Sequence, residues 1–498
     1  TVLAEAEAAS ILDDELKYRL DLRQAFIFTV DPATARDFDD AISLEARRDG
    51  TWRLGVHIAD VSYFVRPGSE LDREARARGT SVYLPDQVLP MLPEQLSNGL
   101  CSLVPHKDRL TFSVFMTVNA EGEILKREFA ESVINSRHRL TYEQAMAAIQ
   151  LPDGAAMPEA DLPPEAVAVV KDVNRLAQVL RARRLSQGAL FMELPEVRIS
   201  IGTDGRIQDL IPSVNDASHQ MIEECMLLAN EAVSEELSLR GRQQIFRIHE
   251  EPDPEKLAEL EGTLFAAGIE TGDLAQRLNL SRLLSHVARL PAAHAWSSAI
   301  LRSLKRALYS TTGSGHFGLA KKFYTHFTSP IRRYPDLVIH RLLKACIHGS
   351  KPPFGRAQLV KLAEHCSERE QLATEAERET VDLKRLRFFS EQLASGQPRE
   401  FEAVVSEVRN FGVFVYLPKV DAYGLIHVSQ LANDFFDFDP VKKRLRGRRE
   451  GVVFSLGCEL SVIIAKVDGD RRMLDFAPVP GSLRSPRGVG DDGLGAPP

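Results

Sequence analysis

Hydrophobic and polar residues alternate with the period of β-strands through much of residues 25–135. The apolar, β-prone segment 25–30 predicts a buried strand, and the alternating segments 52–61 and 109–118 predict two more. A charged segment at 72–78 predicts a helix between them. We therefore expect a sheet to form early in the chain.

The spacing of apolar residues becomes helical after residue 164, and helix is predicted as far as Gln187. A strand pair near 189–211 and a short strand at 244–248 interrupt this pattern. The remaining predicted helices are 215–240, 254–268, 280–309, 335–348 and 357–394. Strands grouped early and helices grouped late predict an α+β fold with a mixed sheet.

Short strands dominate again after Gly396, which suggests a domain boundary. The predicted strands are 401–407, 412–417, 423–427, 459–466 and 472–476. Five strands in about eighty residues predict a small all-β barrel of the OB-fold type. Phe411 and Phe414 flank a glycine in this region, and a run of six cations in eight residues begins with Lys442, Lys443 and Arg444. Aromatic and cationic side chains of this kind could hold a nucleic-acid backbone, although a solvated loop explains the cations equally well.

Composition narrows the class of protein. The net charge is −8, so nucleic acid would have to bind through local patches. The five cysteines are scattered and form no CxxC pair, which argues against a disulfide framework or a zinc site and suits a reducing cytosol. The sequence contains no apolar run long enough to span a membrane and no signal peptide, so we expect a cytoplasmic monomer without a membrane partner.

Four carboxylates, Asp31, Asp37, Asp39 and Asp40, follow the first predicted strand within ten residues. Like charges this close raise one another's pKa, so a positive group should lie among them. Hard divalent cations prefer oxygen ligands, and Mg²⁺ at carboxylates indicates phosphate chemistry. A solvated loop or a set of turn caps would explain the spacing equally well. A calcium loop of the EF-hand type fits poorly, because Ile42 would occupy the position that requires glycine.

Cations that could meet the same anionic substrate occur far along the chain. Arg332 and Arg333 follow Pro330 at the start of a predicted helix, where backbone donors and arginine forks can bind phosphate. A structural salt bridge is the alternative, and Asp336 could hold one of the two arginines. No GxxxxGK[ST] loop is present, which argues against a nucleotide triphosphatase.

Together these segments resemble the RNase II/RNase R family of bacterial exoribonucleases over residues 20–476. The matching segments are 31–41, 55–61, 79–85, 90–94, 221–226, 247–250, 316–319 and 328–336. The last of these, which reads TSPIRRYPD, is long and specific. The C-terminal strands resemble an S1 RNA-binding domain, which is a type of OB-fold.

The resemblance implies processive hydrolysis of single-stranded RNA from a free 3′ end, with release of nucleoside 5′-monophosphates, as in exoribonucleases of the RNase II type. It also implies one or two Mg²⁺ ions, replaceable by Mn²⁺, at the four aspartates. The implied catalytic residues are Asp39, Arg332 and Glu377. Tyr83 is implied to clamp the terminal bases, and Tyr142 and Glu223 to sense the ribose, with Glu224 as a one-position alternative. The positions expected to contact RNA are Tyr83, Tyr142, Phe191, Met192, Glu223, Arg333, Phe411, Phe414, Lys442, Lys443 and Arg444.

The expected organisation is a series of five segments. They are a helical leader (1–20), an RNB-type catalytic domain (21–350), its helical extension (351–396), an S1-type barrel (397–477) and a disordered tail (478–498). Bacterial members of the family usually carry cold-shock-type RNA-binding domains before the catalytic domain, which only about 20 residues precede here. Two other functions compete with this hypothesis. One is a non-catalytic RNA-binding protein or chaperone on the same scaffold. The other is a phosphatase with an Asp-x-Asp nucleophile, which lacks the threonine expected soon after Asp39.

Overall fold

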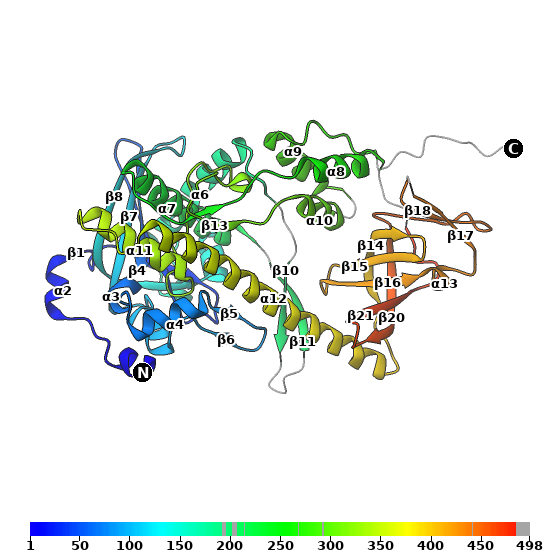
Figure 1. Cartoon of the computed structure of the whole chain (residues 1–498), viewed down its shortest axis with the longest axis horizontal. Coiled ribbons are helices and arrows are strands. Elements are labelled where there is room, and N and C mark those ends of the chain that lie inside the picture. Colours follow the sequence, from blue (N-terminus) through cyan, green and yellow to red (C-terminus); the bar gives the residue numbers. More distant parts are fainter. Residues whose placement is uncertain are drawn as a thin grey trace.

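An α+β unit forms one end of the molecule and a β-barrel the other, in a computed structural model of the chain (Figure 1). The structure describes residues 1–191, 196–201, 207–213, 215–266, 268–290, 293–440 and 442–484. One long helix, α12 (Arg356–Ala394), runs from the α+β unit to the barrel. The predicted fold class is therefore confirmed.

The α+β unit is built on a seven-stranded sheet with the order β1-β8-β7-β4-β3-β2-β9. Its strands are β1 (Leu20–Asp21), β2 (Phe28–Asp31), β3 (Asp40–Ala46), β4 (Trp52–Ala59), β7 (Asp108–Val118), β8 (Ile124–Asn135) and β9 (His138–Thr141). β2 and β3 are antiparallel neighbours. The residue that ends β2, Asp31, and the residue that begins β3, Asp40, therefore lie at the same edge of the sheet.

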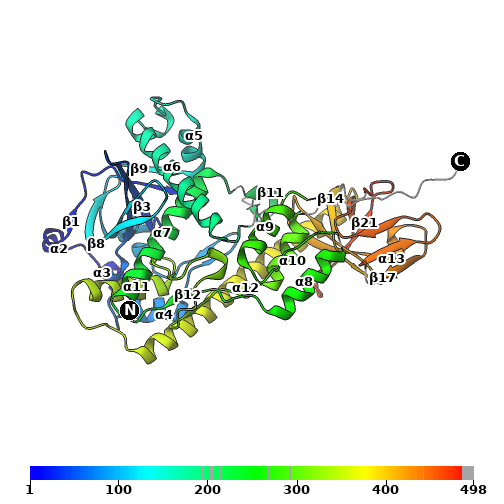
Figure 2. The same cartoon turned by 90° about the horizontal axis from the view of Figure 1, so that it is seen from above.

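Helices pack against this sheet and bury one continuous apolar core with it. Figure 2 shows α5, α6 and α7 along one side of the sheet. The helices of this unit are α3 (Val61–Phe64), α4 (Glu70–Arg78), α5 (Tyr142–Gln150), α6 (Pro164–Ser186), α7 (Ala217–Leu239) and α11 (Tyr334–Ile347). Apolar residues at helical spacing explain the burial, since Met221, Cys225 and Leu228 of α7 all face the core.

Two predicted helices are wrong in detail. The segment 280–309 forms α9 (Arg277–Val287), α10 (Ala293–Ser303) and the strand β13 (Leu308–Ser310), which pairs with β12 (Phe246–Ile248). The sequence carries Pro291 between the two helices, a residue that cannot donate a helical hydrogen bond. The predicted leader helix is two short helices, α1 (Val2–Glu7) and α2 (Asp13–Tyr18). The other elements before the barrel are β5 (Val82–Tyr83), β6 (Val88–Leu89), the pair β10 (Glu196–Ile201) and β11 (Ile207–Ser213), and α8 (Pro254–Ala266).

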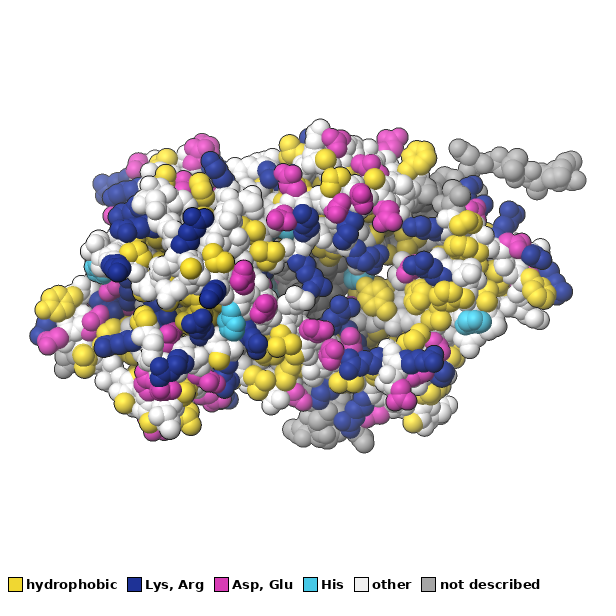
Figure 3. All heavy atoms as spheres, in the orientation of Figure 1, with side chains coloured by type: hydrophobic (Ala, Val, Ile, Leu, Met, Phe, Trp, Pro, Cys, Tyr) yellow, Lys and Arg dark blue, Asp and Glu magenta, His cyan; other side chains and the backbone are white. Residues whose placement is uncertain are grey.

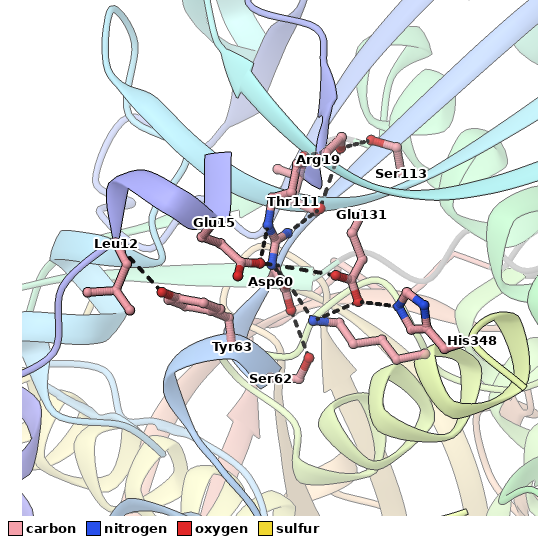
Figure 4. Close-up of polar contacts among 12 residues, drawn as sticks. Leu12, Glu15, Arg19, Asp60, Ser62, Tyr63, Thr111, Ser113, Glu131 and His348 are labelled. Atoms are coloured by element: carbon pink, nitrogen blue, oxygen red, sulfur yellow. Dashed lines mark hydrogen bonds and ion pairs between the residues drawn. The ribbon is translucent and has the colours of Figure 1, made fainter. Parts of the chain in front are cut away.

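A buried ionic network ties the N-terminal segment to the sheet (Figure 4). Arg19, just after α2, lies 2.7 Å from Asp60 Oδ2, and Lys344 of α11 lies 2.7 Å from the same oxygen. Ser62 donates a hydrogen bond to Asp60 Oδ1, and Glu131 pairs with Lys344 at 3.3 Å. Burial raises the pKa of Asp60, but Lys344 and Arg19 outweigh it and hold that pKa well below its usual range. Every charge in this network therefore has a partner of opposite sign.

The C-terminal unit is a closed barrel with the order β14-β15-β16-β21-β20, which confirms the predicted five-stranded barrel. Its strands are β14 (Phe401–Arg409), β15 (Gly412–Leu417), β16 (Ala422–His427), β20 (Glu459–Asp468) and β21 (Met473–Pro478), and α13 (Val428–Leu431) follows β16. A second small sheet of β17 (Phe436–Asp439), β18 (Arg444–Gly447) and β19 (Val453–Ser455) was not predicted. Part of the basic run therefore forms a strand and not a loop.

The long helix α12 shares a core with the barrel. Phe389 is fully buried near the end of α12, with its ring 5.4 Å from that of Phe401 and 5.5 Å from that of Phe476. Leu386, one turn earlier, belongs to the same apolar cluster. The barrel is therefore packed around the end of a helix whose earlier turns reach the α+β unit.

Candidate active site

Asp31 and Asp40 meet where β2 ends and β3 begins. Burial raises the pKa of Asp31 to about 7, and burial together with the charge of Asp31 raises the pKa of Asp40 to about 8. One carboxylate oxygen of Asp31, Oδ2, is buried without a hydrogen-bond partner. The charge of Arg332 lowers both pKa values without outweighing these effects, and neither carboxylate forms an ion pair among the described residues.

Asp39 has a different environment, although it lies between the same two strands. It is fully buried and accepts hydrogen bonds from Ser329 Oγ (2.6 Å), Ile331 N (2.9 Å) and Arg332 Nε (2.8 Å). Both of its oxygens are therefore used by the turn that precedes α11. Asp39 fixes this turn against the sheet and holds the Arg332 side chain in place.

The two adjacent arginines have different partners. The Arg332 side chain is 38% exposed and uses Nε for Asp39, which leaves its terminal nitrogens for other contacts. Arg333 donates from Nε (2.9 Å) and Nη2 (2.8 Å) to the buried Asp336. The structural salt bridge considered from the sequence is thus confirmed for Arg333. Arg332 is the cation better able to meet a phosphate.

A cleft of about 390 Å³ lies beside these groups. It collects side chains from β3, the loop before β5, α5, α7, the turn before α11, and α12. The predicted site residues that line it are Asp40, Tyr83, Tyr142, Arg332, Arg333 and Glu377. Residues from opposite ends of the α+β unit's sequence therefore converge on one hollow.

Tyr83 lies at the rim of this cleft, on the hairpin of β5 and β6, and is 41% exposed. Its backbone N–H donates to Glu377 Oε1 of α12 (2.6 Å), and its hydroxyl donates to Asp37 Oδ2 (3.3 Å). A second tie between the hairpin and α12 is the ion pair of Asp86 with Lys384 at 2.9 Å. In this structure Glu377 holds the hairpin that carries Tyr83.

The proposed ribose sensors lie on α5 and α7. Tyr142 is the first residue of α5, which Thr141 caps with its side chain. The pKa of the Tyr142 hydroxyl is raised by burial and by the charges of Asp40 and Asp31, so it stays a protonated donor. The ring stacks on His219 of α7, with the centroids 3.8 Å apart and the planes 12° from parallel.

The two neighbouring glutamates on α7 are also distinct. Glu224 is buried in an ion pair with Arg184, whose Nε lies 3.1 and 3.2 Å from its two carboxylate oxygens. The Glu223 side chain is 39% exposed and lies 3.4 Å from the same arginine, and burial raises its pKa. Glu223 is therefore the more accessible of the two alternatives.

Of the two neighbouring positions expected to contact RNA, Phe191 and Met192, the structure describes one. Phe191 lies under the guanidinium of Arg181, which is 3.9 Å from the ring centroid. Met192 lies outside the described residues.

The predicted RNA contacts of the barrel lie at the other end of the molecule from the cleft. Phe411 is 44% exposed and packs edge-on against Phe414, with the centroids 6.1 Å apart. Figure 3 shows Lys and Arg side chains over the small sheet of β17 and β18. Some of these cations are paired: Arg444 lies 3.3 Å from Asp439. The net positive charge of this surface is therefore smaller than the basic run in the sequence suggests. Lys442 and Lys443 lie beside this strand, and Lys443 Nζ contacts Thr263 Oγ1 at 3.2 Å.

Comparison with known proteins identifies the family. The RNB domain matches residues 19–349, which is more than half of the chain. The chain belongs to the RNB family. The S1 RNA binding domain matches residues 399–477, so the RNB unit is followed by an S1 domain.

Curated relatives of this RNB protein include ribonuclease R of Thermotoga maritima, which is 41% identical over 488 residues, covering 95% of the chain and 67% of the relative. Ribonuclease R of Escherichia coli is 39% identical over 95% of the chain and 58% of the relative. The chain thus spans roughly 58–67% of the length of these two relatives. Among solved structures, Mycoplasma genitalium RNase R in complex with ribose methylated single-stranded RNA aligns with a TM-score of 0.86 and 29% identity, over 96% of this chain and 75% of that one.

The donor set of this RNB site fits a hard cation. In the part of the chain that the structure describes, no three His, Cys, Asp or Glu side chains gather as a ready-made metal site. The unpartnered Oδ2 of Asp31 and the raised pKa of Asp31 and Asp40 nevertheless show that the fold alone stabilises the charged form of these carboxyl groups poorly. Oxygen donors of this kind suit Mg²⁺ or Mn²⁺. The four-aspartate ligand set stays a prediction, and Asp39 is the member whose oxygens are already in use.

Several residues of the site were not found from the sequence. His219 is one, although its i, i+4 spacing from Glu223 on a predicted helix was a usable signal. Glu370 of α12 also lines the cleft, and Arg247 holds it from another element. Such pairs between distant segments leave no local pattern in the sequence. No described helix is long and apolar enough to cross a membrane, and all five cysteines are buried and free.

Proposed function

We propose that the chain is a 3′-to-5′ exoribonuclease that hydrolyses single-stranded RNA to nucleoside 5′-monophosphates with Mg²⁺ or Mn²⁺. The observation that carries this proposal is a pair of neighbouring carboxylates with raised pKa values, the buried Asp31 and the half-buried Asp40, beside a cleft that Arg332 also lines. A protein that only binds RNA would gain nothing from unpaired negative charge facing an anionic backbone. The curated relatives named ribonuclease R support the same reaction class.

In the proposed mechanism, Asp31 and Asp40 would hold the cation, because neither forms an ion pair among the described residues and Oδ2 of Asp31 has no hydrogen-bond partner there. A divalent cation supplies a Lewis acid for the scissile phosphate and a water activated for attack. Arg332, held at Nε by Asp39, neutralises charge that develops on the phosphoryl oxygens. Asp39 therefore acts by positioning this arginine, in addition to any contact with the cation.

Residues in and beside the cleft hold the RNA strand. The exposed ring of Tyr83 stacks on the terminal base, and Glu377 and Asp37 fix the ring through the backbone and the hydroxyl. Tyr142 and Glu223 offer a hydroxyl and a carboxylate to the ribose 2′-OH, the group that distinguishes RNA from DNA. Because the base is held by its face and not by its edge, we expect little preference for sequence.

The decisive experiment incubates the purified chain with an RNA that carries a single-stranded 3′ tail. With Mg²⁺, we expect nucleoside monophosphates to accumulate from the first cut, and a chelator should abolish their release. Matched single-stranded DNA should bind but be cut far more slowly. If RNA binds with Mg²⁺ or Mn²⁺ present and no mononucleotide appears, the proposal is wrong and a non-catalytic RNA-binding protein on the same scaffold is favoured. A blunt duplex in a parallel lane tests tolerance of structured RNA, and sedimentation tests the proposed monomer.

The barrel is proposed to add affinity without touching the chemistry. Because Phe389 of α12 belongs to the barrel core, point variants test this more cleanly than removal of the barrel. Replacing Phe411 and Lys442 with alanine should weaken RNA binding and lower its dependence on salt. Single-turnover cleavage at saturating enzyme should stay within about twofold of wild type, since affinity no longer limits the rate. A collapse of that rate in a folded variant would place the barrel in the active site.

A further inference from the structure

We propose that His219 is a positioning residue that fixes the ring of Tyr142 and thereby sets how strictly the site requires a ribose. The proposal rests on the proposed function, in which Tyr142 reads the 2′-OH. Its basis is the stack of the two rings, which are 3.8 Å apart and 12° from parallel. Contact over the whole ring face restricts the tilt of Tyr142 more than an edge contact would.

His219 is itself held in a single orientation. Its Nδ1 lies 2.9 Å from Asp216 Oδ1, and the same oxygen accepts hydrogen bonds from Ser218 N (3.0 Å) and His219 N (3.3 Å). Asp216 is the N-cap of α7, so the imidazole is tied to the start of that helix. The plane on which Tyr142 rests is thus fixed by the capping of a 23-residue helix.

Tyr142 packs against the main apolar core in addition to His219. It is the first residue of α5, and the capping box formed by Thr141 and Gln144 restrains the backbone but not the ring. Tyr142 lines the cleft together with Asp40 and Arg332. A small rotation of the ring would move the hydroxyl relative to the sugar bound beside these groups.

The helix α7 relates the two ribose contacts to each other. His219 and Glu223 are four residues apart and therefore lie on the same face, one turn from each other. Ile222 and Met226, which have the same spacing, line the cleft. One helix therefore sets both the carboxylate of Glu223 and, through His219, the hydroxyl of Tyr142.

The test compares His219→Ala, which removes the stacking ring, with His219→Phe, which keeps a ring but loses the bond to Asp216 and the imidazole. The chain offers a matched control in His294 of α10, which stacks on Tyr416 of the barrel at 3.7 Å and 10°. His294→Ala removes an equally close stack far from the cleft. Cleavage is measured under single-turnover conditions with Mg²⁺, on an RNA and on the same oligomer with 2′-deoxy sugars in its last three nucleotides.

We expect His219→Ala to slow cleavage of the RNA about tenfold, because a displaced hydroxyl no longer meets the 2′-OH. RNA affinity and the rate on the deoxy substrate should both stay within about twofold, so the ratio of the two rates falls about tenfold. His219→Phe should restore part of the ratio, because it keeps the ring face but loses the bond to Asp216 that orients it, and His294→Ala should leave the ratio unchanged. A merely structural defect would slow both substrates alike.

Three results would overturn the inference. The first is a wild-type ratio in His219→Ala, and the second is an equal loss of the ratio in His219→Ala and His219→Phe, which would assign the effect to the imidazole itself. The third is a similar fall in His294→Ala. Failure of the proposed function is distinguishable, because the wild type would then cut neither substrate. In that case the same three variants are compared for RNA and DNA affinity in chelator, and unchanged sugar selectivity of His219→Ala also rejects the inference.

Discussion

Two clusters of buried carboxylates lie in the same α+β unit and differ in their charge balance. Around Asp60, two cations contact the same carboxylate, at 2.7 Å each, and its pKa is held low despite burial (Figure 4). Around Asp31 and Asp40, the pKa values rise to about 7 and about 8, and one oxygen of Asp31 has no partner. Two cations act on each of the three carboxylates, but only Asp60 forms direct ion pairs with its cations among the described residues, so direct pairing makes the difference.

This difference separates a structural cluster from a functional one. The Asp60 cluster is complete within the chain and joins the N-terminal segment, the sheet and α11. The Asp31 and Asp40 cluster is incomplete, because Arg332 pairs with Asp39 and not with Asp31 or Asp40. Carboxyl groups whose charged form the fold stabilises poorly mark a candidate site for a cationic ligand. The following predictions test this distinction.

The largest expected effect is that of Asp31→Asn on the rate of RNA cleavage. Asp31→Asn keeps the shape of the side chain but removes the unpaired charge and a strong oxygen ligand. Loss of several kcal/mol at the metal site would slow single-turnover cleavage about a thousandfold or more. RNA affinity measured in chelator should not fall, since one repulsive charge is gone. The free energy of unfolding without metal should rise or stay unchanged. Cleavage near the wild-type rate would show that the cluster is a turn and not a catalytic site.

For Asp60→Asn we expect a loss of stability with little effect on cleavage, the reverse of Asp31→Asn. Removing one partner leaves Arg19 and Lys344 buried without their shared anion, which should lower the free energy of unfolding by about 3–5 kcal/mol. Cleavage per folded molecule should change by no more than a few-fold, because the network lies away from the cleft. Urea unfolding and an active-site-normalised rate provide the two measurements. Asp49→Asn, an exposed turn carboxylate, serves as the control for a general loss of charge.

The parts of the fold and of the candidate site that could be predicted from the sequence are those set by interactions between residues close together in the chain. The long helix was predicted at 357–394 and observed at 356–394, because a long run of helix-forming residues without Gly or Pro is a local signal. The aspartate run and Arg332 were also identified from local motifs. The role of Asp39 was not, since its hydrogen bonds to Ser329 join residues 290 positions apart. The small sheet around β18 was missed for a related reason, because its strands are rich in charge and depend on pairing with one another.

The effect of added metal on the melting temperature should distinguish the Asp60 cluster from the cluster of Asp31 and Asp40. A cation that binds only the folded chain raises the free energy of unfolding by about 2.7 kcal/mol at a hundred times its dissociation constant. We expect Mg²⁺ or Mn²⁺ to raise the melting temperature of wild type and of Asp60→Asn, but not of Asp31→Asn. Ca²⁺ and monovalent salt at equal ionic strength control for screening. An equal shift in all three proteins would locate the bound cation elsewhere.

The smallest expected effect is on the acid side of the stability profile. The pKa of Asp60 is raised by burial but lowered further by Lys344 and Arg19, so the folded value lies below the unfolded value of about 3.9. Above that unfolded value the carboxylate is charged in both states, and its full contribution to stability is present. As the pH falls below about 4, the unfolded chain takes up a proton that folded Asp60 does not, and stability is lost at up to about 1.4 kcal/mol per pH unit.

The Asp60→Asn variant lacks this group, while its other titrating groups are shared with wild type. The difference in the free energy of unfolding between the two proteins should therefore be constant from pH 7 to about 5 and shrink toward pH 3. Urea unfolding at pH 7, 5, 4 and 3 measures this difference directly. A difference that stays constant down to pH 3 would mean that Asp60 is not held charged by its two cations, and the contrast between the two clusters would lose its electrostatic basis.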